Sequence, residues 1–139
     1  MKLKIKLEQG AYLPTRAHKK DAGLDLYAME DGRIPPHGRA IFDTGVHVAI
    51  PEGYVGLLTS KSGLMANEGI TNEGTIDADY TGTIKAVLFN DSDKIVRIRQ
   101  GQKITQLLVL PIVTPEVEVV DELEETERGN GGFGSTGAF

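Results

Sequence analysis

Short segments in which apolar and polar residues alternate recur along most of this chain. In residues 2–7, Leu3, Ile5 and Leu7 alternate with lysines. This two-residue period is that of a β-strand with one buried face and one face in water. Further strands, separated by turn residues, are predicted at residues 22–28, 45–50, 54–59, 83–89, 95–99, 102–111 and 116–120. Many short strands at this spacing favour an all-β sandwich, jelly roll or barrel.

A single short helix is expected, at residues 60–69. Ser62 could cap its first turn, where free backbone N–H groups beside Lys61 could bind an anion. An ordinary capped turn with an exposed lysine explains the same residues. The end of the chain is acidic and then rich in glycine, which cannot fill a core. We therefore predict a β domain at residues 1–120 and a flexible C-terminal arm at residues 121–139.

Composition narrows the possible functions. The 139 residues suit one domain and include no cysteine, which excludes disulfides and thiolate metal sites and fits a reducing, cytoplasmic location. A net charge of −5 argues against stable nucleic-acid binding, so a polyanionic small ligand would need local cations and backbone N–H groups. The histidines are too widely separated for a zinc pair, and no apolar run is long enough for a membrane span.

Candidate chemistry begins in residues 74–82, where Asp77 and Asp79 flank Ala78. In an extended strand both carboxylates would point to one face, about 7 Å apart. The simplest interpretation is a strand that ends in a functional turn, and a surface hairpin with two solvated acids is the alternative. Gln106 interrupts an apolar stretch and needs a hydrogen-bond partner in the core or on a ligand.

The C-terminal arm combines an arginine, exposed glycine backbone, one aromatic ring and two hydroxyls at residues 128–137. Arginine can bind phosphate through two hydrogen bonds, glycine exposes N–H groups, and an aromatic ring can stack on a base. These are the groups that a lid over a nucleotide would use. A disordered terminus is the alternative.

Five blocks of the sequence, in this order, resemble the homotrimeric dUTPase family, whose members hydrolyse dUTP to dUMP and pyrophosphate. They are residues 22–28, 61–64, 74–82, 101–107 and 128–137. The resemblance implies a distorted jelly roll or β-barrel, Mg²⁺ as cofactor, and a homotrimer with active sites between subunits. It also implies a role in limiting uracil incorporation into DNA and supplying dUMP for dTMP synthesis. A bacterial or phage origin fits it.

The resemblance also implies roles for individual residues. Asp77 resembles the general base that activates water for attack on the α-phosphorus, and Asp25 resembles the carboxylate that holds Mg²⁺ through water. The phosphate contacts would be Lys61, Ser62, Gly63, Gln106, Arg128, Ser135 and Thr136. The base and sugar contacts would be Asn72, Gly74, Ile76, Tyr80 and Phe133, with Tyr80 under the deoxyribose and Phe133 over the uracil.

Three departures from the family pattern stand out. Lys61 replaces the usual arginine and loses its bidentate geometry while keeping the charge. Gln102 replaces an acid, a change expected to affect a surface turn. The segment from Met65 to Thr75 is shorter than in many family members, which bears on how strictly the chain selects uracil and on the register of Asn72.

Two alternative functions are considered. The dCTP deaminases share the trimeric β architecture, but Tyr80 and the complete arm are typical of the hydrolase. A non-catalytic nucleotide sensor or protein-binding trimer is disfavoured by the presence of Asp25, Asp77 and Arg128.

Overall fold

Antiparallel strands make up most of the ordered structure, which is a computed structural model that describes residues 1–139. The strands are β1 (Lys4–Leu7), β2 (Leu24–Tyr27), β3 (Gly32–Ile34), β4 (Arg39–Ala49), β5 (Tyr54–Thr59), β6 (Ile70–Thr71), β7 (Glu73–Ile76), β8 (Thr83–Asn90), β9 (Val96–Ile98) and β10 (Lys103–Pro111). The one helix is α1 (Ser62–Glu68). The predicted all-β class with one short helix is confirmed.

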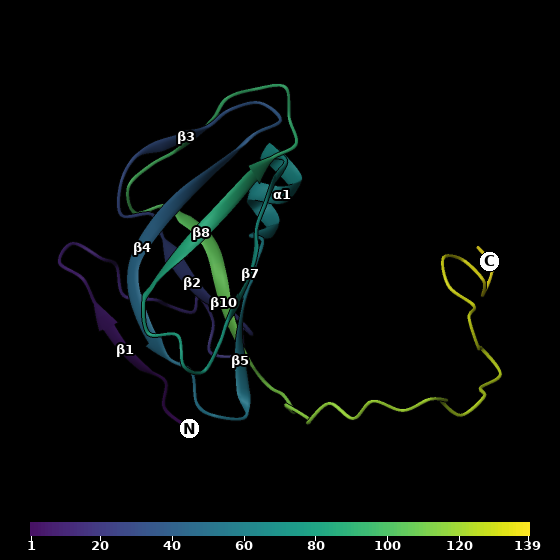
Figure 1. Cartoon of the computed structure of the whole chain (residues 1–139). Coiled ribbons are helices and arrows are strands. Elements are labelled where there is room, and N and C mark those ends of the chain that lie inside the picture. Colours follow the sequence, from purple (N-terminus) through teal and green to yellow (C-terminus); the bar gives the residue numbers. More distant parts are fainter.

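Two four-stranded sheets form the body, with the orders β1-β4-β8-β6 and β2-β10-β5-β7, and β3 pairs with β9 beside them (Figure 1). Alternate side chains of β4 and β8 point into the core, as the two-residue period requires. The sheets pack as a jelly roll and do not close into a barrel. The buried apolar residues form two clusters, one around Leu88 and Ile98 and the other around Leu26 and Leu107.

Most predicted strands lie where the alternation placed them, and β5 spans the predicted residues 54–59. β4 begins at Arg39, well before the predicted start. The short strands β3 and β6 were not predicted, whereas β9 lies within the predicted residues 95–99. The side chains of Leu3, just before β1, and Ile5 pack on the core as expected, whereas Leu7 is exposed.

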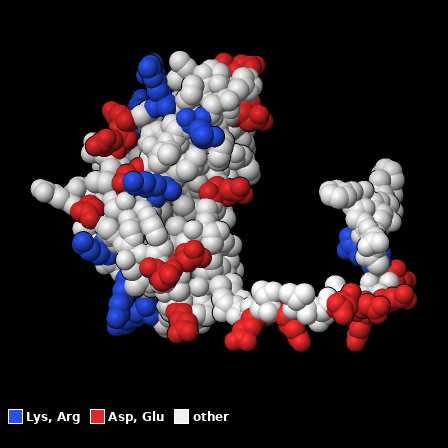
Figure 2. Space-filling view, viewed as in Figure 1, with Lys and Arg blue, Asp and Glu red and all other residues white.

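The predicted strand at residues 116–120 is wrong for the single chain. This segment is extended but pairs with no other strand, and Val117 and Val119 are 93% and 92% exposed. It belongs to a long arm that leaves the body after β10 and ends far from it (Figure 1). Acidic side chains are spaced along this arm, as Figure 2 shows. A strand needs hydrogen-bond partners on a neighbouring strand, and none is within reach here.

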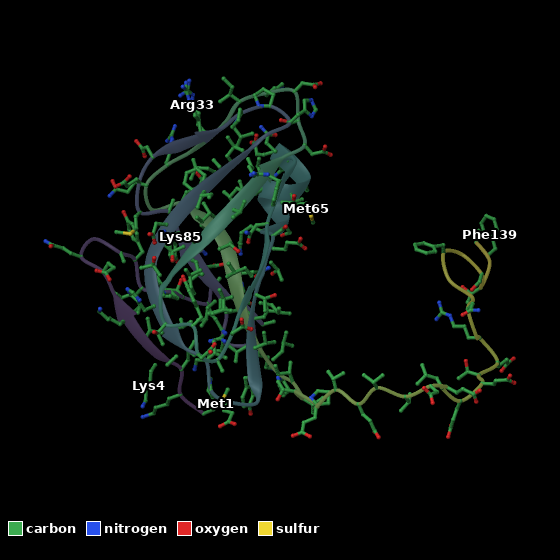
Figure 3. The ribbon with its side chains drawn as sticks, viewed as in Figure 1. Met1, Lys4, Arg33, Met65, Lys85 and Phe139 are labelled. Carbon is green, nitrogen blue, oxygen red and sulfur yellow. The ribbon has the colours of Figure 1, made fainter.

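The helix also differs from its prediction in one respect. Lys61 is the N-cap residue and makes no side-chain capping bond, so the prediction that Ser62 caps the helix is wrong; Ser62 is the first helical residue. Gly69 ends the helix with a left-handed φ of 68°. Met65 points outward from α1 (Figure 3), whereas Leu64 packs against the core. With its seven residues, the helix lacks the length and apolar character that a membrane span requires.

Candidate active site

A buried carboxylate held by two lysines forms the centre of one candidate site. Asp25 lies on β2 and is 5% exposed. Its Oδ1 is 2.5 Å from Nζ of Lys61, and its Oδ2 is 2.8 Å from Nζ of Lys103. Burial raises the pKa of Asp25, but hydrogen bonds and charge from Lys103 and Lys61 outweigh it, so the pKa lies below its usual value. The contact with Asp25 raises the pKa of Lys103.

Around this carboxylate is an open polar pocket of about 370 Å³. Gln106 is Cα partner to Asp25 across β10 and β2, and its Nε2 donates a hydrogen bond to the Ser60 carbonyl at 3.2 Å. Gln106 therefore has the hydrogen-bond partner that a polar side chain in an apolar strand needs. A side chain at Gly23 would collide with Gln106, so this glycine lets the loop close over the amide. Open space surrounds Gly63 at the start of α1, where a ligand could approach the backbone.

Lys103 is the site residue that sequence reasoning missed. It begins β10, opposite Tyr27 at the end of β2, and this pairing brings its ammonium to the carboxylate two residues earlier on β2. The sequence offered one signal for this residue: a lysine at the start of the predicted strand that also carries Gln106. Gln102, just before it, accepts a hydrogen bond from the Arg99 N–H at 3.0 Å and closes a surface turn, as expected.

The second group of candidate residues lies in the turn after β7. The strand ends at Ile76, and the Asp77 carbonyl accepts a hydrogen bond from the Tyr80 N–H at 3.1 Å. The extended geometry that would place Asp77 and Asp79 on one face is therefore wrong, whereas a strand that ends in a turn is confirmed. The Tyr80 hydroxyl donates to the Thr83 carbonyl at 2.9 Å, and its ring covers Gly82.

Two residues predicted to contact base or sugar have side chains that serve the core. Asn72 is 5% exposed; its Nδ2 donates to the Val87 carbonyl at 3.0 Å, and its Oδ1 accepts a hydrogen bond from the Thr105 hydroxyl. Ile76 packs in the second core cluster. Neither side chain is free to bind a base. The Asn72 backbone is also occupied, because its N–H donates to the Ser60 hydroxyl at 2.8 Å and its carbonyl accepts from that hydroxyl at 3.0 Å. Gly74, against Leu58, offers backbone, beside a hollow of about 540 Å³.

The two groups of residues lie apart within one chain. Asp25, Gln106, Thr59 and Glu73 are successive Cα partners across β2, β10, β5 and β7. Asp77 follows four residues after Glu73, so strand spacing and rise place it on the order of 20 Å from Asp25. The far end of the arm lies away from the body in Figure 1. Its Arg128 Nε donates to the Gly131 carbonyl at 2.8 Å, and Phe133 is fully exposed.

Comparison with known proteins identifies the family of the chain. The family model described as dUTPase matches residues 9–137. The chain belongs to the dUTPase family. It is 45% identical to the deoxyuridine 5'-triphosphate nucleotidohydrolase of Yarrowia lipolytica, over 99% of this chain and 90% of that protein. The enzyme of the same name from Corynebacterium glutamicum is also 45% identical, over 96% of this chain and 92% of that one.

Solved dUTPase structures share the fold. A mutant dUTPase of Staphylococcus bacteriophage 80alpha with dUpNHpp has a TM-score of 0.91 and 37% identity, covering 98% of each chain. A mutant dUTPase from phage phi11 of S. aureus, described as coordinating a structural Mg(II) ion, has a TM-score of 0.84 and 33% identity, covering 90% of this chain and all of that one. The family match favours dUTPase over the alternative enzyme class, dCTP deaminase.

Proposed function

We propose that this protein is a dUTP diphosphatase that hydrolyses dUTP to dUMP and pyrophosphate. The observation that carries the proposal is the Asp25 pocket, which Lys61, Lys103 and Gln106 all line. Phosphoryl transfer depends mainly on positioning and on neutralising charge, and this pocket supplies cations and N–H donors for both. Such hydrolysis limits uracil incorporation into DNA and supplies dUMP.

Asp77 is the proposed general base. Its carboxylate is exposed on a turn, where it can accept a proton from a water molecule directed at the α-phosphorus. Tyr80, on the same turn, offers a ring that is 44% exposed and held by its hydroxyl, which suits packing under a deoxyribose. The backbone of Gly74 and Ile76 would contact the base and sugar.

The Asp25 carboxylate fits Mg²⁺ held through water. Mg²⁺ keeps several waters and is usually held by one or two carboxylates together with substrate phosphates, so a lone carboxylate is sufficient. No cluster of three or more acidic or histidine side chains that could bind an ion by themselves exists in the chain. When bound with the nucleotide, the ion would neutralise charge on the phosphates. Lys61 and Lys103 would then turn from Asp25 toward phosphate oxygens.

The separation of Asp77 from Asp25 supports active sites built between subunits of a homotrimer. A general base must come within hydrogen-bond reach, directly or through one water, of the group it activates. A distance on the order of 20 Å, estimated from strand spacing and rise, exceeds that reach. We infer that the Asp77 turn of one subunit faces the Asp25 pocket of another.

The arm would complete the site from a further subunit. Residues 112–127, if fully extended, span roughly 50 Å, which is enough to cross from one subunit to another. Arg128, Ser135 and Thr136 would then bind the terminal phosphate and Phe133 would stack on uracil, excluding bulk water. The apolar side chains of Val117 and Val119 would find cover on the way.

Product analysis tests this proposal. The purified protein with Mg²⁺ is given dUTP, dCTP, dTTP and UTP separately, while pyrophosphate and the nucleoside monophosphate are identified. Pyrophosphate and dUMP from dUTP alone are expected. Release from several nucleotides would show that the short hairpin around Asn72 does not select uracil. Binding without turnover would overturn the proposal and favour a nucleotide sensor.

A further inference from the structure

A histidine outside the five family blocks contacts the turn that carries Asp77. His47 lies on β4 with its side chain 18% exposed. Its Nδ1 is 2.6 Å from the Thr81 carbonyl oxygen, and its Nε2 is 2.6 Å from Oε1 of Glu8. One imidazole therefore connects the turn to the residue that follows β1.

Both partners of His47 are hydrogen-bond acceptors. A carbonyl oxygen has no proton to give, and an ionised carboxylate has none either. A neutral imidazole carries one N–H and can satisfy only one of them, whereas the imidazolium donates to both. With Glu8 ionised, only the doubly protonated ring donates to both partners, and deprotonation would place two acceptors against each other at one contact.

The charges around the ring agree with this protonation state. Hydrogen bonds to the Thr81 carbonyl and then to Glu8 raise the pKa of His47, whereas burial and Lys6 lower it. The hydrogen bond from His47, followed by the charge of Lys6, lowers the pKa of Glu8, and Asp43 opposes this. Lys4 lines the surface groove that His47 and Thr81 also line, and the turn itself carries Asp77 and Asp79.

β4 contacts the segment after the turn at a second point. The Thr83 hydroxyl donates to Oδ2 of Asp43 at 3.2 Å, where the pairing of β4 with β8 is irregular between Asp43 and His47. Gly45 forms this irregularity with a φ of 63°, and its N–H donates to Oδ1 of Asp43 at 2.8 Å. β4 therefore contacts the residues on both sides of Gly82, through Thr81 and Thr83. The ring of Tyr80, which the nucleotide would contact, covers this glycine.

We propose that the imidazolium of His47 is a positioning residue, which fixes the Asp77 and Tyr80 turn through Thr81 and releases it when the ring loses a proton. This inference rests on the proposed hydrolysis, because it assigns the turn a catalytic task. As the pH rises through the titration of His47, the turn should loosen and turnover should fall. A structural histidine elsewhere in the protein would not produce this coupling.

Three variants separate the parts of the contact. His47→Phe keeps a ring of similar size but removes both donors, and His47→Gln keeps one donor that can reach the Thr81 carbonyl. Glu8→Gln removes the carboxylate and leaves the ring. The matched control is His37→Asn, because His37 also lies 2.6 Å from an acid, Asp93, on a different part of the surface. Asparagine suits the positive φ of 51° at that position.

Turnover and hydrogen exchange are then measured against pH. We expect kcat for dUTP to fall about 10- to 100-fold in His47→Phe and less in His47→Gln, with the alkaline decline of the wild type lost in both. Amide exchange in residues 77–83 should quicken in the same order without any nucleotide. Unchanged exchange in His47→Phe would overturn the proposal even if dUTP proves not to be the substrate.

The wild-type protein provides a test that needs no variant. Nitrogen-15 NMR of the histidine rings should show a titration midpoint of His47 above the ordinary value for histidine, with both ring nitrogens protonated below it. The midpoint should match that of the increase in exchange at residues 77–83, after correction for the intrinsic pH dependence of exchange. A titration midpoint of His47 at or below the ordinary histidine value, or exchange in the turn that does not change as His47 titrates, would contradict the proposal.

Discussion

A Cβ atom at Gly23 would lie 2.5 Å from Oε1 of Gln106, closer than any real contact allows. The loop before β2 therefore depends on glycine to cover this amide. We expect Gly23→Ala to displace Gln106 from the Ser60 carbonyl and to raise KM for dUTP by about tenfold, roughly the value of one lost hydrogen bond. Steady-state kinetics measure this change.

A double-mutant cycle isolates the cause of that change. In a Gln106→Ala background, Gly23→Ala should add little, because the colliding side chain is already absent. If the two substitutions instead multiply their effects on KM, the glycine acts through the backbone and not through Gln106.

The second prediction concerns Lys103, which contacts Asp25 directly although the sequence analysis did not assign it to the site. Lys103→Met should raise KM for dUTP about 10- to 100-fold, as expected for the loss of a charge-assisted hydrogen bond to phosphate. Lys94→Met is the control, because Lys94 is exposed and forms no ion pair. Equal KM values for the two variants would remove Lys103 from the phosphate site.

The difference between Gln106 and Lys103 illustrates what could be predicted from sequence. An amide in an apolar strand is unusual by itself, so Gln106 could be selected from its local surroundings. The role of Lys103 depends on the pairing of β10 with β2, two strands far apart in the chain. His47 is a similar case, because its contacts come from Glu8 and Thr81 on separate segments.

Errors in the fold predictions have related physical causes. Residues 116–120 have the alternation of a strand but lack a partner in this chain, and periodicity does not report partners. The family resemblance assigns Asn72 a contact with the base, and the hydrogen bonds that join its side chain to Val87 and Thr105 come from strands distant in the sequence, which periodicity does not report either. The strand β8 was located correctly because its eight residues alternate clearly, whereas β10 was located from its long apolar stretch.

Asp77→Asn tests the proposed general base. The amide keeps the size of the side chain but cannot accept a proton, so kcat should fall by about 10²- to 10⁴-fold while nucleotide binding survives. Asp79→Asn is the matched control, because it neutralises the other acid of the same turn, and its effect should be far smaller. Equilibrium binding of a non-hydrolysable dUTP analogue accompanies the kinetics. An active Asp77→Asn variant would exclude this residue as the base.

Complementation between inactive chains tests whether sites are shared between subunits. A chain that ends at Glu127 should fold but turn over little, because it lacks the arginine, hydroxyls and ring of the arm. Co-expressed with Asp77→Asn, it should regain activity, since some sites would combine an intact Asp77 turn with an intact arm from another subunit. If each site is complete within one chain, the mixture stays as inactive as its parents. Separation of the mixed oligomers by differential tags before assay ties any recovered turnover to assemblies that contain both chains.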